Sequence, residues 1–259
     1  MLLLKEGRVS AKRVKAVLNL TQTTSPSYIL LSSLDVARKQ IATQGQGLIA
    51  QTLKLAKWVR EEFKQIPGIK LFGENLTGEP GCFGFDPTKI TINVRNLGMS
   101  GYEMEKILRS KYRIQVELSD LYNTMFLVTL GDTWESVTYL ADCIKEIAGE
   151  RTYDNVIKIC PPVPEIPVLS ISPREAFYSD TRIVSLQEGV GEISAEAIMA
   201  YPPGIPLICP GEIITQEIID YVNILKQENA DLQGTEDPYI NKVKVVNMPT
   251  TKRLPAEKI

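Results

Sequence analysis

The 259-residue sequence is 44% hydrophobic and 23% charged, which suits a globular protein that buries at least one sizeable core. Its 29 basic and 31 acidic side chains leave a net charge of -2, so no overall positive field attracts nucleic acid or an anionic membrane. The apolar runs are far shorter than the roughly 20 residues that a membrane span needs. We therefore expect a cytoplasmic protein with neither nucleic acid nor a membrane as partner.

The absence of histidine restricts the possible chemistry. It removes the commonest general base, the Ser-His and Cys-His nucleophile pairs and the commonest zinc ligand. The cysteines have no paired spacing typical of a zinc or dithiol site. We interpret them as buried thiols and predict no metal site; they are Cys82, Cys143, Cys160 and Cys209.

The N-terminal segment, residues 1–20, mixes apolar and basic side chains at helical spacing and predicts a short solvated helix or a helix-loop. Residues 21–28 predict a loop, because Pro26 disfavours helix at the preceding residue. Ser32 and Ser33 are candidate N-caps for a helix that begins near Leu34 and that Gly45 and Gly47 interrupt. From Leu48 onward, apolar residues at steps of three or four predict an amphipathic helix.

The central segment predicts an α+β arrangement with helices on one face of a sheet. Residues 90–94 alternate as a half-buried strand, and residues 114–117 and 124–129 are further predicted strands. Ser100 and Glu103 have the spacing of a capping box and predict the start of one helix. Asp132 and Thr133 offer caps for the next helix.

The proline-rich segment 160–167 cannot sustain a helix and predicts a domain boundary. Beyond it we predict partial helix over 185–200, with a turn at Gly189-Val190-Gly191 before that helix. The remaining predicted elements are a rigid turn at 201–206, a strand at 207–209, a helix capped by Thr215 and a strand at 242–246.

Four stretches together resemble the ornithine/lysine/arginine decarboxylases of the aspartate-aminotransferase fold. They are Thr23-Thr24-Ser25-Pro26-Ser27-Tyr28 with Ser33-Leu34-Asp35-Val36-Ala37-Arg38; Asp86-Pro87-Thr88-Lys89 with Gly101-Tyr102-Glu103 and Ile114-Gln115-Val116-Glu117; Gly191 to Ala197; and Tyr201-Pro202-Pro203-Gly204-Ile205-Pro206 with Pro210-Gly211-Glu212. These enzymes are pyridoxal-phosphate (PLP) enzymes of fold type I.

The resemblance implies a fold of the α/β and α+β classes in three parts. Residues 1–47 correspond to the tail of the PLP-binding large domain, residues 48–158 to the small α+β domain, and residues 159–259 to the decarboxylase C-terminal α+β domain. It also implies PLP as cofactor and a basic amino acid as substrate, with arginine favoured over lysine or ornithine. Such enzymes build their sites at dimer interfaces, so a homo-oligomer or an N-terminal fragment is the implied partner.

The family's Schiff-base lysine lies in a Ser-x-His-Lys motif, which cannot be present in a chain without histidine. We therefore expect a truncated gene product, an internal start or one piece of a split enzyme, with no catalytic residue of its own. Lys89 and Lys111 match the small domain and are interpreted as solvated surface lysines. The chain alone is expected not to decarboxylate arginine, lysine or ornithine.

The resemblance assigns two candidate binding sites. Thr23, Thr24 and Ser25 would hold the PLP phosphate, and the alternative is an ordinary Ser/Thr turn. Glu117 would receive the cationic tail of the substrate, and the alternative is a surface glutamate at a strand end. Two other functions stay open: a noncatalytic interaction module or remnant, and another fold type I enzyme such as an aminotransferase.

Overall fold

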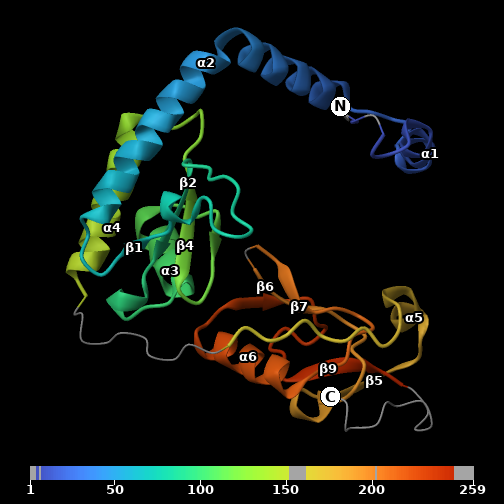
Figure 1. The fold of residues 1–259 in the computed structure, drawn as a ribbon. Coiled ribbons are helices and arrows are strands. Elements are labelled where there is room, and N and C mark those ends of the chain that lie inside the picture. The colour runs from blue at the N-terminus through green and yellow to red at the C-terminus, as the bar shows by residue number, and fades with distance from the viewer. Residues whose placement is uncertain (1–3, 6, 152–161, 202, 248–259) are drawn as a thin grey trace. The chain divides into compact units, whose positions relative to one another are not determined.

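The structure is a computed structural model that describes residues 4–5, 7–151, 162–201 and 203–247. The chain divides into two compact units, Met1–Ala50 and Gln51–Ile259, and each is described by itself. The helices and strands of both units are drawn along the chain in Figure 1.

The first unit consists of α1 (Ala11–Thr21) and the first part of α2 (Tyr28–Lys64). Ser10 caps α1 by accepting a hydrogen bond from the Arg13 N–H, as expected for a helix that begins after a serine. No residue of α1 is buried. The predicted N-terminal helix is thus confirmed.

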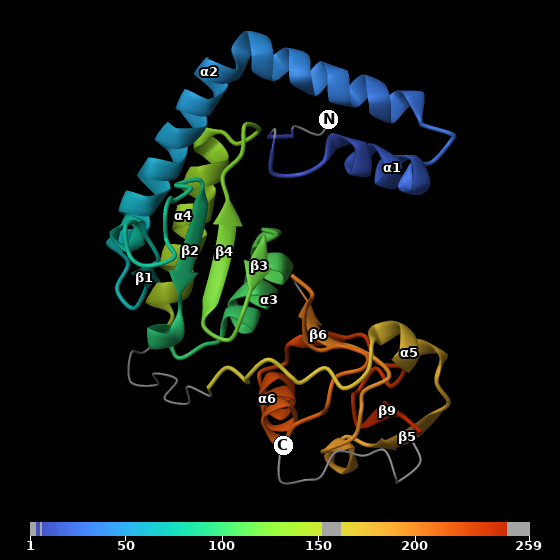
Figure 2. The same cartoon turned by 45° about the vertical axis from the view of Figure 1, so that its right-hand side comes forward.

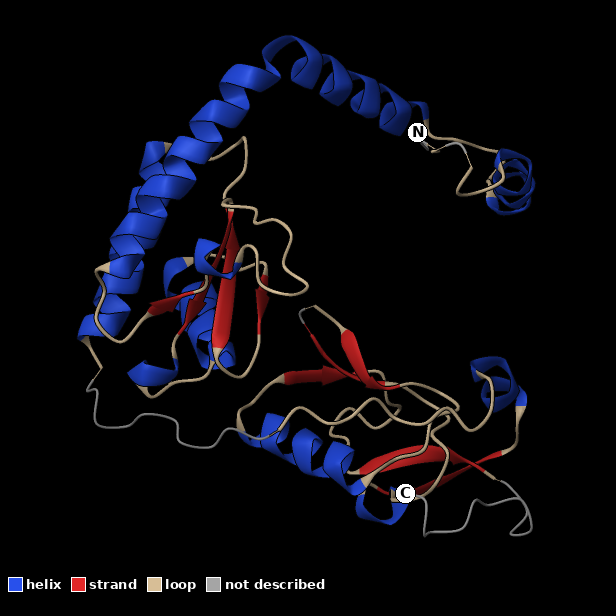
Figure 3. Cartoon of the chain, in the orientation of Figure 1, coloured by secondary structure: helices blue, strands red, loops and turns tan. Residues whose placement is uncertain are grey.

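The predicted break in the next helix is wrong, because α2 runs through both glycines without interruption (Figure 3). Each glycine costs about 1 kcal/mol relative to alanine in a helix, and the strong helix formers around them offset that cost. Gly45 is buried, and a Cβ there would lie 3.3 Å from the Ile41 side chain. Neither Ser32 nor Ser33 is an N-cap, because α2 already begins at Tyr28. The Ser33 hydroxyl donates to the Leu30 carbonyl inside the helix.

The second unit begins with a four-stranded antiparallel sheet in the order β1-β2-β4-β3, visible in Figure 2. Its strands are β1 (Lys70–Leu71), β2 (Lys89–Asn93), β3 (Leu118–Ser119) and β4 (Asn123–Leu127). Its helices are the end of α2, α3 (Gly101–Tyr112) and α4 (Trp134–Gly149), with short 3-10 turns η1 (Glu74–Leu76) and η2 (Arg95–Leu97).

One face of this sheet carries the core. Ile90 pairs with Phe126 across β2 and β4, and both belong to a single buried cluster with residues of α2, α3 and α4. Phe63 of α2 packs edge-on against Phe126, with ring centroids 6.0 Å apart. The predicted layering of helices on one face is therefore confirmed.

The caps in this region follow the sequence. Ser100 accepts from the Glu103 N–H at the start of α3, and Thr133 forms a capping box with Ser136 at the start of α4. The caps at Ser100 and Thr133 are therefore confirmed. The capping box predicted for Ser100 is not completed, because the Glu103 carboxylate accepts from Arg151 Nη2 at 2.7 Å instead.

The residues that follow form a second mixed region of helices and antiparallel strands. Its helical elements are α5 (Pro173–Tyr178), η4 (Gln187–Gly189) and α6 (Gln216–Gln227). Strands β5 (Thr181–Ser185) and β9 (Lys242–Val246) pair with each other, and β7 (Ile205–Ile208), β6 (Ile198–Tyr201) and β8 (Asp231–Gln233) form a three-stranded sheet. Thr215 caps α6 by accepting from the Ile218 N–H, which confirms that prediction.

The predicted helix within 185–200 is wrong. The segment turns through η4, and the N–H of Gly191 donates to the carbonyl of Ile214. Single bridges then pair Ile193 with Ile213 and Ser194 with Val245 before β6 begins. Pairing with neighbouring strands supplies the backbone partners that a helix would otherwise provide, so the glycine turn leads into a strand instead.

The cysteine prediction is only partly right. Cys143 is buried, and burial raises the pKa of its thiol. Cys82 and Cys209 are half-buried. Cys160 and Pro202 lie outside the described residues, as does the start of the predicted boundary at 160–167. Residues 162–167 are described and form neither helix nor strand.

Candidate functional site

The hydroxyl segment Thr23-Thr24-Ser25 joins α1 to α2. The N–H of Gln22 closes α1 by donating to the Leu18 carbonyl, and Ser27 accepts from the Leu30 N–H at the start of α2. Each of these helix ends thus has one bond from a neighbouring residue. The three hydroxyl side chains are exposed, and none of them has a hydrogen-bond partner among the residues that the structure describes.

Glu117 is exposed and stands immediately before β3. Its N–H donates to the Met125 carbonyl across the sheet at 2.9 Å. The predicted strand at 114–117 is wrong, because Arg113 adopts a left-handed conformation with φ of 56°. The Ile114 N–H then bonds back to the Leu108 carbonyl at the end of α3, so these residues form the turn that leads to the strand.

The hydroxyl segment belongs to the first unit and Glu117 to the second. Each is accordingly defined by its own surroundings.

The turn beside Glu117 is held by Asp120. Its Oδ1 accepts from the N–H groups of Tyr122 and Asn123, both at 2.7 Å. Gly101, at the start of α3, lies against this turn so closely that an added Cβ would be 2.1 Å from the Asn123 carbonyl oxygen. The Asp120 carboxylate thus has a structural use.

The two lysines interpreted as surface residues are both exposed. Lys111 forms ion pairs with Glu146 at 2.9 Å and with Glu150 at 3.4 Å. Lys89 lies 3.9 Å from Asp86. A lysine nucleophile is activated by removal from water, and neither of these exposed lysines is in such an environment.

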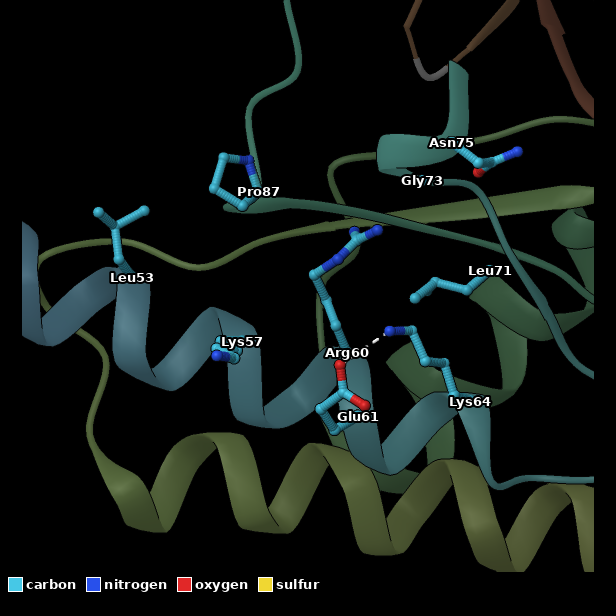
Figure 4. Close-up of a pocket in the computed structure, with 9 residues that line it drawn as sticks. All are labelled: Leu53, Lys57, Arg60, Glu61, Lys64, Leu71, Gly73, Asn75 and Pro87. Atoms are coloured by element: carbon cyan, nitrogen blue, oxygen red, sulfur yellow. Dashed lines mark hydrogen bonds and ion pairs between the residues drawn. The ribbon is translucent and has the colours of Figure 1, made fainter. Parts of the chain in front are cut away.

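A basic pocket that the sequence analysis did not single out lies beside the second half of α2 (Figure 4). It has a volume of about 610 Å³. We define the basic pocket by the residues that line it: Leu53, Lys57, Arg60, Glu61, Lys64, Leu71, Gly73, Asn75 and Pro87. The helical spacing of its three cations was a readable signal, although lysines and arginines on an amphipathic helix are usually solvated.

The described part of the chain contains no group of three or more His, Cys, Asp or Glu side chains placed to hold a metal ion. It also contains no helix that is both long and apolar enough to cross a membrane.

Comparison with solved structures defines the class of fold. The chain superimposes on the lysine decarboxylase of Francisella novicida with a TM-score of 0.71 at 23% identity, over 93% of this chain and 46% of that one. At this identity the likeness concerns the fold alone. The mixed helix-and-sheet architecture is therefore one found in amino-acid decarboxylases.

Sequence comparison identifies the family. The family profile described as "Orn/Lys/Arg decarboxylase, major domain" matches residues 1–136, and "Orn/Lys/Arg decarboxylase, C-terminal domain" matches residues 163–241. The chain belongs to the Orn/Lys/Arg decarboxylase family.

Two similar relatives carry the name arginine decarboxylase. The one from Bacillus anthracis is 43% identical over 93% of this chain, and the one from Bacillus subtilis is 43% identical over 94%. In both cases the match covers 50% of the relative. The chain thus spans about half the length of the curated relatives it matches.

Proposed function

We propose that this chain is the C-terminal part of a PLP-dependent decarboxylase of a basic amino acid, with arginine as the favoured substrate, lysine or ornithine next, and the cytoplasm as its location. The 43% identity to proteins named arginine decarboxylase supports this choice. The proposal includes a fold type I arrangement with parts at 1–47, 48–158 and 159–259.

The hydroxyl segment is proposed to contact the PLP phosphate. Thr23, Thr24 and Ser25 offer three exposed hydroxyl groups next to a helix start, and none is occupied by a described intramolecular bond. A phosphate ester needs several converging donors, so these residues fit the group. When bound, PLP supplies the electron sink that makes loss of CO2 from an amino acid possible.

Glu117 is proposed to receive the cationic end of the substrate. Its side chain is exposed, while its backbone is fixed to β4 through Met125. A carboxylate on a fixed strand end can orient a guanidinium or ammonium group by charge-assisted hydrogen bonds.

The isolated chain is proposed to be inactive, because a protein without histidine lacks the family's Ser-x-His-Lys motif. The proposed partner is a polypeptide that carries this lysine, or a second copy within a homo-oligomer. The purified chain, given PLP and carboxyl-labelled arginine, should release no CO2, and borohydride should fix no PLP on one lysine. Labelled CO2 from the chain alone would contradict this part of the proposal.

Mixing the chain with the part of the B. subtilis arginine decarboxylase that it does not match tests the residue assignments. The mixture should release CO2 from arginine faster than from lysine. Thr24→Val should raise the PLP concentration needed for half-maximal activity. Thr21→Val is the matched control, because the Thr21 hydroxyl already donates to the Val17 carbonyl within α1.

Glu117→Gln should raise KM for arginine in the same mixture with a smaller change in kcat. Glu79→Gln, at another exposed turn position, is its control. Equal effects of the two glutamate substitutions would remove Glu117 from the proposed site.

A noncatalytic interaction module is a second candidate, favoured by the apolar surface of the first unit. Ile29, Leu34 and Val36 of α2 are 83%, 67% and 65% exposed. Exposed apolar residues in such numbers mark interaction surfaces. Failure of every mixture to release CO2, with stable association of the two polypeptides, would favour this function.

A further inference from the structure

The strand that follows Glu117 is short and depends on contacts outside the sheet for its register. β3 consists of Leu118 and Ser119 alone. They pair with Met125 and Thr124 of β4. A ladder of two pairs specifies a register less firmly than a longer one, and a slip by one residue turns every side chain of a strand to the opposite face. Whatever else holds β3 in register therefore also holds Glu117, the residue before it.

A buried side-chain hydrogen bond joins β3 to α3. The Ser119 hydroxyl donates to Glu105 Oε2 at 2.8 Å. Ser119 is 1% exposed and Glu105 is 4% exposed, so water does not compete for this bond. Glu105 Oε1 forms an ion pair with the guanidinium of Arg109, one turn further along α3. Each carboxylate oxygen thus has a partner, and one of the two partners lies on the strand.

A buried carboxylate is costly to keep for stability alone. Its removal from water carries a desolvation penalty that pairing offsets only in part, and apolar side chains of similar volume often serve a fold equally well. The best-attested use of such a group is to select one register over another.

Glu105 fits that use, because only one register of β3 gives its Oε2 a donor. After a slip by one residue, the position opposite Glu105 would hold either Leu118 or Asp120 in place of Ser119. Leucine would leave the oxygen without a hydrogen-bond donor, which is costly in a buried place. Aspartate would bring a second negative charge against the first. The observed register avoids both.

The bond that fixes the Glu117 backbone belongs to this same register. Its N–H donates to the carbonyl of Met125 at 2.9 Å, and Met125 is the β4 residue paired with Leu118. A shift of β3 along β4 would break this bond and move the Glu117 carboxylate. We propose that Ser119 and Glu105 are positioning residues, which fix the strand register that presents Glu117 to the cationic end of the substrate. This inference rests on the proposed function of Glu117.

Ser119→Ala, in the mixture with the unmatched part of the B. subtilis enzyme, is the first test. KM for arginine should rise by up to about fivefold, the size expected when an exposed ionic contact is weakened, with little change in kcat. In a chain that already carries Glu117→Gln, Ser119→Ala should cause no further rise in KM, because the carboxylate that it positions is gone. Residues that act through one another are non-additive in this way.

Thr133→Ala is the matched control. It removes the hydroxyl that caps α4 by accepting from the Ser136 N–H, so it lowers stability without a contact to β3, and KM should stay unchanged. Glu105→Gln is the conservative variant. Its amide oxygen can still accept from the Ser119 hydroxyl, and KM should stay near the wild-type value.

Hydrogen–deuterium exchange of the chain alone gives a readout that does not need activity. Exchange at the Glu117 amide should be faster in Ser119→Ala than in the wild type, and unchanged in Thr133→Ala. Unchanged exchange at Glu117, or a further rise in KM when Ser119→Ala is added to Glu117→Gln, would overturn the proposal. A KM effect of Glu117→Gln without one of Ser119→Ala would overturn this inference alone, whereas an unchanged KM in Glu117→Gln would remove the proposed function of Glu117 as well.

Discussion

Substituting Gly101 by alanine is the sharpest test of the packing around the Asp120 turn. An ideal Cβ on Gly101 would lie 2.1 Å from the Asn123 carbonyl oxygen and 2.3 Å from that of Asp120. Real Cβ atoms essentially never come closer than 3.0 Å to such atoms. The turn or the start of α3 must therefore move by about 0.9 Å, the difference between 3.0 and 2.1.

The expected loss in free energy of unfolding follows from the contacts that this movement disturbs. Overpacking of this kind costs about 1–3 kcal/mol. The Gly101 N–H also donates to the Leu121 carbonyl at 3.3 Å, and loss of one such bond costs about 1 kcal/mol. We expect Gly101→Ala to lower the free energy of unfolding by about 2–4 kcal/mol, which is about 4–16 °C in midpoint for a protein of this size.

Gly149→Ala is the matched control for this experiment. Gly149 is the last residue of α4, and nothing lies within 4 Å of an added Cβ. Alanine there should leave stability unchanged or raise it by up to about 1 kcal/mol. Urea unfolding followed by circular dichroism measures both variants, and a Gly101 variant as stable as the Gly149 variant would refute the reasoning.

Three further predictions concern a helix cap, pH and self-association. Thr215→Ala removes the hydroxyl that accepts from the Ile218 N–H at 3.3 Å and should cost about 1 kcal/mol in urea unfolding. Backbone N–H groups, chiefly that of Tyr239, lower the pKa of Asp237 from its ordinary 3.8. The stability that the Asp237 carboxylate contributes to the folded state is therefore complete above pH 3.8 and is lost as pH falls through its lower pKa in the folded protein. Asp237→Asn should flatten the decline in urea midpoint on acidification. Leu34, 67% exposed on α2, should support self-association, which Leu34→Lys should reduce in sedimentation velocity.

The local features of the fold were readable from sequence because they depend on neighbouring residues. Ser100, Thr133 and Thr215 each cap the helix they precede, since a short hydroxyl side chain satisfies an N–H two or three residues ahead. The alternation of apolar and polar residues at 90–94 likewise predicted β2, whose buried residues share one face of the sheet.

The errors arose where tertiary contacts outweighed local preference. Gly45 did not end α2, because its missing side chain suits a buried position in a helix of good formers. The strand expected at 114–117 was displaced by the left-handed turn at Arg113. Neither outcome can be derived from the residue's own type, since each depends on what packs beside it.

The candidate sites also differ in how far the sequence alone reveals them. Pattern and resemblance pointed to Thr23, Thr24 and Ser25, and their role remains a prediction. The basic pocket was missed because its parts come from separate segments: Arg60 lies on α2, while Gly73 follows β1. Only the fold brings the guanidinium and the glycine together.

The most specific family motif has an architectural explanation. Gly211 in Pro210-Gly211-Glu212 has φ of +94°, and a Cβ there would lie 2.3 Å from the Ile171 carbonyl oxygen. The Glu212 carboxylate accepts from the Cys209 N–H at 2.7 Å. Gly211 thus permits a close approach of two backbone segments, and Glu212 closes the turn that follows Cys209. Gly211 therefore has a reason for its place in the motif that lies in backbone geometry and does not depend on ligand binding.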